Sequence, residues 1–178
     1  MPTLPALFIS HGAPDILLRD TPASRFLRGL SQSLPRPRAI VVASAHWTTS
    51  AVTVGSAARP DTIHDFGGFG PDLATRRYGA PGDPALAEEV RSALARNGLA
   101  ATAAARGFDH GVWVPLSLMY PEAQTSVVPI SAEMGAMHLA GRRPDTKKVC
   151  WPVDGIASRR CPAFDPQYSR DSPHRRVA

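Results

Sequence analysis

Histidine is the residue type whose placement in this sequence suggests chemistry, because two of the six histidines follow short apolar runs. His11 comes after the run 4–9, and His46 comes after the run 39–43. If both runs are parallel strands, the two side chains meet at the carboxyl edge of a sheet, where open α/β sheets bind their ligands. Imidazoles at such an edge suit a divalent transition metal. Either histidine alone could be a hydrogen-bonded turn residue, but the matching positions favour a metal site.

The remaining histidines fit proton transfer or substrate contact. His110 stands among apolar and aromatic side chains, where desolvation lowers the pKa of an imidazole and keeps it available to accept a proton. A buried structural histidine is the alternative at that position. His64, beside Asp65 in a glycine-rich loop, is expected either to touch substrate or to be solvated. His138 fits a helix surface or an active site, and His174 is expected to be inert.

An alternation of strands and helices is predicted to position these side chains. The apolar runs 4–9 and 39–43 are predicted to be buried strands, and the helical spacing of 23–34 between them completes a β-α-β unit. The pattern continues with a strand around 52–54, a helix from the N-cap Asp83 to Gly98, a helix over 111–119 and a strand over 125–130. The predicted fold class is α/β, with a central, mostly parallel sheet covered by helices on both faces.

The charge of the chain is concentrated at one end. Residues 1–141 carry eleven arginines, no lysine and eleven acidic residues, whereas residues 142–178 carry nine basic and four acidic residues. Both lysines and both cysteines also fall after Gly141, and prolines interrupt every window there. We therefore expect one domain over 1–141 and a basic, proline-rich, disordered tail over 142–178.

Five short motifs resemble those of one enzyme family, in the same order and with approximately the same spacing. They are Phe8-Ile-Ser-His-Gly-Ala-Pro14, Ser44-Ala-His-Trp47, His64-Asp-Phe-Gly-Gly-Phe69, Tyr78-Gly-Ala-Pro-Gly82 and Asp109-His-Gly-Val-Trp-Val-Pro-Leu116. Residues 1–141 of the chain resemble the class III extradiol ring-cleavage dioxygenases of the DOPA-dioxygenase type.

The resemblance implies a sheet-centred α/β fold with one non-haem Fe(II) ion, or Zn(II) as in some relatives. It implies that His11 and His46 are metal ligands and that His110 and His138 are catalytic. His64 and Asp65 are predicted from their loop to bind the substrate. The implied reaction opens the ring of a catechol with O2, at a metal that keeps open coordination positions.

The sequence also departs from the family pattern. The later part of the pattern, which supplies a glycine-rich strand end, a His-Asn pair and a third metal ligand, does not follow Gly141. A truncated or frameshifted gene is therefore expected, and an inactive relative is one alternative function. A zinc-dependent hydrolase is another, because zinc held by histidines activates water without redox chemistry.

The remaining expectations concern partners and location. Nucleic-acid binding is not expected, because the basic residues of the tail lack interleaved aromatic residues in a known motif. No run approaches the roughly 20 apolar residues of a membrane span, and no signal core is present, so a cytoplasmic location without membrane contact is expected. The partners expected are a small aromatic catechol and O2, with a homo-oligomer favoured where an incomplete sheet exposes its core.

Overall fold

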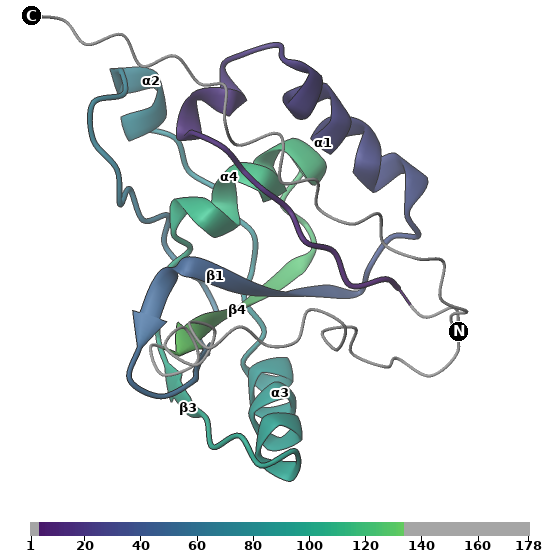
Figure 1. The fold of residues 1–178 in the computed structure, drawn as a ribbon, viewed down its shortest axis with the longest axis vertical. Helices are drawn as coiled ribbons and strands as arrows, with labels where there is room; N and C mark the ends of the chain where they lie inside the picture. The colour runs from purple at the N-terminus through teal and green to yellow at the C-terminus, as the bar shows by residue number, and fades with distance from the viewer. Residues whose placement is uncertain (1–3, 134–178) are drawn as a thin grey trace, which may run out of the picture. The chain divides into compact units, whose positions relative to one another are not determined.

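The computed structural model describes residues 4–133, and within them a four-stranded sheet carries helices on both of its faces (Figure 1). The strands are β1 (Ala39–Thr49), β2 (Thr53–Gly55), β3 (Thr102–Ala104) and β4 (Ser126–Glu133). The helices are the 3-10 turn η1 (Pro14–Leu17), α1 (Pro22–Ser33), α2 (Pro71–Ala74), α3 (Pro84–Arg96) and α4 (His110–Met119). None of the helices in this part of the chain has the length and apolar character that a membrane-spanning helix needs.

The sheet is mixed, with strand order β1-β4-β2-β3. The pairs β1–β4 and β2–β3 are parallel, and β2 meets β4 in antiparallel orientation. The α/β class predicted from the sequence is confirmed, and two of the three strand pairings are parallel. The larger core lies between α1, α4 and β4, where Trp113, Val112 and Val127 are almost wholly buried.

Helix α3 covers a second, smaller core on the side of β2 and β3. Its N-cap is Asp83, whose carboxylate accepts a hydrogen bond from the backbone of Leu86 at 2.9 Å, and Pro84 occupies the first turn. Leu86, Val90 and Leu94 lie on one face of the helix and pack toward Val54 and Val128.

The prediction of a buried strand over 4–9 was wrong. This segment is extended but has no strand pairing within residues 4–133, and Phe8 is fully exposed. An apolar run indicates side chains that favour burial, whereas a strand also needs a neighbouring edge for its backbone, and Pro5 offers no N–H for such a ladder. The β-α-β unit expected over 4–43 therefore does not form in the described part of the chain, and the parallel partner of β1 is β4.

The second predicted strand is real but longer than expected, because β1 runs on past Ala43 to Thr49. His46 therefore lies within a strand and not after it. The register of β1 against β4 shifts between Ser44 and Thr48, which leaves three residues of β1 outside the regular ladder. Bulges of this kind turn side chains out of their normal alternation, and they occur next to active sites.

Candidate metal centre

Three histidines from three separate parts of the fold meet at one place. His11 ends the extended N-terminal segment, where Gly12 adopts the left-handed backbone conformation at φ 65°. His46 lies at the irregularity of β1, and His110 is the first residue of α4. One possible ligand atom from each side chain lies within 4.8 Å of those of the other two. The sequence predicted the meeting of His11 with His46, and the structure adds His110.

The Nε2 atoms of His11 and His46 are 2.9 Å apart. Two imidazole nitrogens at this distance either share one proton or face a common ion. Nitrogens that each lie about 2.1 Å from one ion, at right angles to each other, are about 3.0 Å apart. The donor set of neutral imidazoles is also one that Fe(II) and Zn(II) accept, so the residues present fit a single divalent ion.

The surroundings keep His11 in the neutral form that binds metals. Partial burial lowers the pKa of its imidazole. The neighbouring His110 and His46 lower the pKa further, because a positive charge on His11 would be repelled by a positive charge on either of these imidazoles. Within the described residues, the buried Nδ1 atom of His11 has no hydrogen-bond partner. Nε2 of His11 is thus the nitrogen that faces another histidine.

His110 is fixed by Asp65, which the sequence had placed near the substrate. The Oδ1 atom of Asp65 lies 2.8 Å from Nδ1 of the His110 ring and accepts the backbone N–H of the same residue at 3.0 Å. Partial burial alone would raise the pKa of Asp65, but these two hydrogen bonds outweigh it and hold the pKa below its usual value. The ionised carboxylate therefore holds the proton of His110 on Nδ1 and leaves Nε2 free.

Aromatic side chains form a wall beside this pair. The ring of Phe66 stands edge-on to His110, with 5.6 Å between centroids, and the ring of Trp113 lies 6.0 Å from Phe66. His64 lies against Phe66 and Trp113, and its Nε2 atom is 3.0 Å from the carbonyl oxygen of Arg76. His64 thus belongs to the wall, and its contact with substrate stays a prediction.

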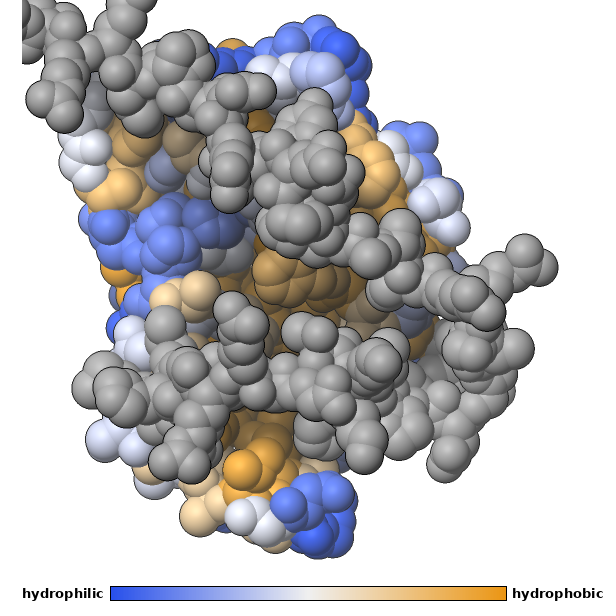
Figure 2. Space-filling view, in the orientation of Figure 1, coloured by the Kyte–Doolittle hydropathy of each residue, from blue (hydrophilic) through white to orange (hydrophobic). Residues whose placement is uncertain are grey.

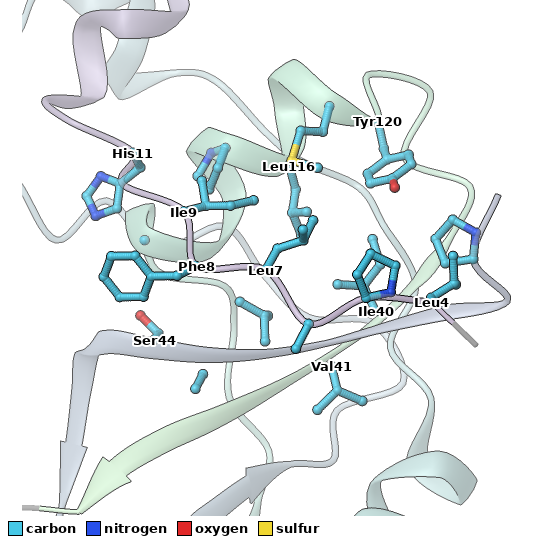
Figure 3. Close-up of a pocket in the computed structure, with 18 of the residues that line it drawn as sticks. Leu4, Leu7, Phe8, Ile9, His11, Ile40, Val41, Ser44, Leu116 and Tyr120 are labelled. Atoms are coloured by element: carbon cyan, nitrogen blue, oxygen red, sulfur yellow. The ribbon is translucent and has the colours of Figure 1, made fainter. Parts of the chain in front are cut away.

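An apolar cleft of about 720 Å³ leads to the histidines. It lies between the N-terminal segment, β1 and α4, and Figure 3 shows Leu7, Ile9 and Leu116 beside it, with His11 and Ser44 at one end. Apolar surface is visible in the middle of the same face in Figure 2. The volume is within the range of small-molecule sites, and the lining suits an aromatic ring more than a charged group.

Sequence reasoning missed three residues that support the site, namely Ser44, Asp109 and Gly111. Ser44 and Asp109 are buried and joined by a hydrogen bond of 2.6 Å. A Cβ atom on Gly111 would lie 2.6 Å from Cδ2 of His46, so only glycine lets α4 approach the ring this closely. Each of the three stands within two residues of a histidine in the motifs, which is the only signal that could have found them. His138, predicted to be catalytic, lies outside the described residues.

Comparison with known proteins places this site in a family. Residues 5–142 match the family described as the catalytic LigB subunit of aromatic ring-opening dioxygenase. The chain belongs to the LigB family of class III extradiol dioxygenases.

Several similar proteins are named as dioxygenases. The chain is 45% identical over 130 residues to a 4,5-DOPA dioxygenase extradiol of Escherichia coli K12. The aligned region covers 73% of this chain and 48% of that protein. It is 42% identical to a 4,5-DOPA dioxygenase extradiol of Beta vulgaris, with 75% and 51% covered. It is 39% identical to the dioxygenase tasH of Hapsidospora irregularis, with 71% and 43% covered. The chain thus spans about half the length of these relatives.

A solved structure supports the fold. The crystal structure of an uncharacterized protein from Escherichia coli K12 superposes with a TM-score of 0.52 at 36% sequence identity. The superposition covers 65% of this chain and 42% of that one. An experimentally determined protein therefore shares the α/β arrangement over this part of the chain.

Proposed function

We propose that this chain carries the first half of an extradiol dioxygenase site, in which a divalent metal and O2 open the ring of a catechol. The observation that carries the proposal is the 2.9 Å approach of the Nε2 atoms of His11 and His46, with His110 beside them. Membership of the LigB family and the names of the similar proteins support ring opening as the reaction. DOPA is one candidate among the catechols.

His11 and His46 are proposed as the metal ligands, because their Nε2 atoms face each other at 2.9 Å and they come from separate parts of the fold. A bound Fe(II) ion would supply the redox chemistry of ring opening, whereas Zn(II) would supply Lewis-acid chemistry alone. The third protein ligand is expected from the part of the relatives' length that this chain does not match.

His110 is proposed to handle protons. Its Nδ1 atom is held by Asp65, so Nε2 can accept a proton from a catechol hydroxyl and return it after the ring has opened. His138 is proposed as a second acid or base, and His64 as a contact with the substrate. The aromatic wall of Phe66 and Trp113 would exclude water beside the reacting ring.

The test is anaerobic reconstitution of the 178-residue chain with Fe(II), followed by O2 uptake and absorbance measurements with L-DOPA and simple catechols. Yellow ring-opened semialdehyde that forms in proportion to O2 uptake, and that disappears in His11→Ala, is the expected result. Retention of the metal without O2 uptake would contradict the dioxygenase proposal.

The same reconstituted chain separates the two alternatives. Hydrolysis of an ester substrate by the Zn(II) form, without O2 uptake by the Fe(II) form, would favour the zinc hydrolase. Absence of both activities together with absence of bound metal would favour the inactive relative.

The boundary near residue 141 is proposed from composition, and the family match ends close to it, at residue 142. Limited trypsin digestion followed by mass spectrometry tests the boundary. We expect the early cuts to fall at the nine basic residues of 142–178. Early cuts among the arginines of 1–141 would contradict it.

A further inference from the structure

Asp109 is a buried carboxylate that does not perform the task its position suggests. It is the N-cap residue of α4, where an aspartate normally accepts hydrogen bonds from the first backbone N–H groups of the helix. Its side chain makes no such hydrogen bond, although only 1% of the residue is exposed. Instead, its Oδ1 atom accepts a hydrogen bond of 2.6 Å from the hydroxyl of Ser44, a residue of β1 that is equally buried.

The hydrogen bond continues from Ser44 to a proposed metal ligand. The backbone N–H of His46 donates to Oγ of Ser44 at 3.2 Å. A Cβ atom built on Gly111 would lie 2.6 Å from Cδ2 of His46, 2.9 Å from Oγ of Ser44 and 3.2 Å from Oδ1 of Asp109. The imidazole of His46, the hydroxyl of Ser44 and the carboxylate of Asp109 therefore all lie next to Gly111.

The negative charge of Asp109 is only partly balanced within the described residues. Its nearest cation is Arg106, whose guanidinium lies 3.6 Å from Oδ2, is 28% exposed and also stacks over Trp47 at 4.9 Å. Burying a carboxylate is costly unless hydrogen bonds or an opposite charge compensate it. A divalent cation held by the neighbouring His11 and His46 would supply further compensation, because it would bring a positive charge close to the buried carboxylate.

We propose that Asp109 is a positioning residue for the metal site: through Ser44 it fixes the backbone of His46, and its buried charge favours a divalent cation bound by His11 and His46. The proposal deepens the proposed function, since it rests on the same metal site. It does not depend on ring opening, because metal binding can be measured without O2 or catechol.

Titration of the full chain with Zn(II), in competition with a chromophoric chelator, tests the proposal. The variants are Asp109→Asn, which keeps the shape and removes the charge, and Ser44→Ala, which removes the link to His46. The matched control is Asp83→Asn, which alters the N-cap carboxylate of α3, a helix that packs on β2 and β3.

We expect Zn(II) affinity to fall roughly 10–100-fold in Asp109→Asn, the range for residues that support metal ligands, and by less in Ser44→Ala. The Asp83→Asn control should bind Zn(II) with wild-type affinity.

Wild-type Zn(II) affinity in Asp109→Asn, with the folded state verified by circular dichroism, would overturn the proposal while leaving the metal site intact. If Asp109→Asn does not fold, unchanged affinity in Ser44→Ala overturns it. Absence of Zn(II) binding by the wild type would overturn the metal site itself, whereas Zn(II) binding without dioxygenase activity would overturn only the reaction.

Discussion

The Nε2 atoms of His11 and His46 lie 2.9 Å apart, although 35 positions separate the two residues in the sequence. Their approach depends on the end of an extended segment and on an irregularity in β1, so neither element alone forms the site. His11 and His46 would bind the metal, whereas His110 would transfer protons beside it. Variants of these residues can distinguish the two roles.

Replacement of the two proposed ligands, His11 and His46, should affect metal retention, and replacement of His110 should not. We expect His11→Ala and His46→Ala to lose bound Fe(II) on gel filtration, because each removes one of the two Nε2 atoms that face each other at 2.9 Å. His110→Gln should retain the metal but lower ring-opening turnover by about 10²–10⁴-fold, the usual contribution of a general acid or base. Metal analysis and O2 uptake measure the two effects. Loss of metal in His110→Gln would show that His110 is the third ligand.

Replacement of Asp65 should impair His110 without removing the metal. Asp65→Asn keeps an acceptor for Nδ1 of His110 but removes the negative charge that holds the imidazole in place. We expect turnover to fall about 10–100-fold, as for other residues that orient a functional histidine. Asp61→Asn is the matched control, because Asp61 is an exposed carboxylate of the same loop. Equal losses of turnover in Asp65→Asn and Asp61→Asn would mean that turnover depends on the charge of the loop and not on the hydrogen bond between Asp65 and His110.

The sequence allowed the helices to be predicted better than the site. Helix α3 carries its own signals, namely the N-cap Asp83, Pro84 and an apolar face, and it formed as predicted. The contacts of His110 with Asp65 and of Ser44 with Asp109 join residues 45 and 65 positions apart through irregular segments. The hydrophobic periodicity of the sequence does not predict such contacts, because they depend on the path of the loops at the end of the sheet. The meeting of His11 with His46 was predicted from two strands, yet only one strand formed.

Gly111 should tolerate no side chain. A Cβ atom there would lie 2.6 Å from the His46 ring and 2.9 Å from the Ser44 hydroxyl, closer than such atoms can approach. We expect Gly111→Ala to lower the free energy of unfolding by about 1–3 kcal/mol, as overpacking does, and to weaken Zn(II) binding by displacing His46. Urea denaturation and metal titration measure these effects.

Gly29→Ala is the control for that substitution. Gly29 lies in α1 with nothing within 4 Å of its added Cβ atom, so alanine should stabilise the helix by about 0.5–1 kcal/mol. A Gly111→Ala variant with wild-type stability and metal affinity would show that the start of α4 can shift away from β1.

The phenol of Tyr78 should make the protein sensitive to alkaline pH. Only 3% of the residue is exposed, and its hydroxyl donates to the carbonyl oxygen of Tyr120 at 3.2 Å. Burial raises the pKa of the Tyr78 phenol, and Tyr120 and Glu122 nearby raise the pKa further. The unfolded chain ionises this group at its ordinary pKa of about 10. The stabilisation is therefore fully present below pH 10 and is lost as the pH rises from there toward the higher pKa of the folded state.

Tyr78→Phe removes both this pH dependence of stability and the hydrogen bond to the carbonyl oxygen of Tyr120. We expect the variant to be less stable than wild type by about 1 kcal/mol at pH 8, the typical contribution of one hydrogen bond. Between pH 10 and pH 11 the difference in stability between wild type and variant should shrink, because only the wild type loses up to about 1.4 kcal/mol per pH unit from this group.

Urea denaturation at several pH values measures the stability of both proteins as a function of pH, with Tyr120→Phe as the comparison. The pKa of the Tyr120 phenol is also raised by burial, but more of that residue is exposed, so its variant should flatten the curve less. Parallel curves for Tyr78→Phe and wild type would mean that Tyr78 becomes accessible to solvent before the protein unfolds.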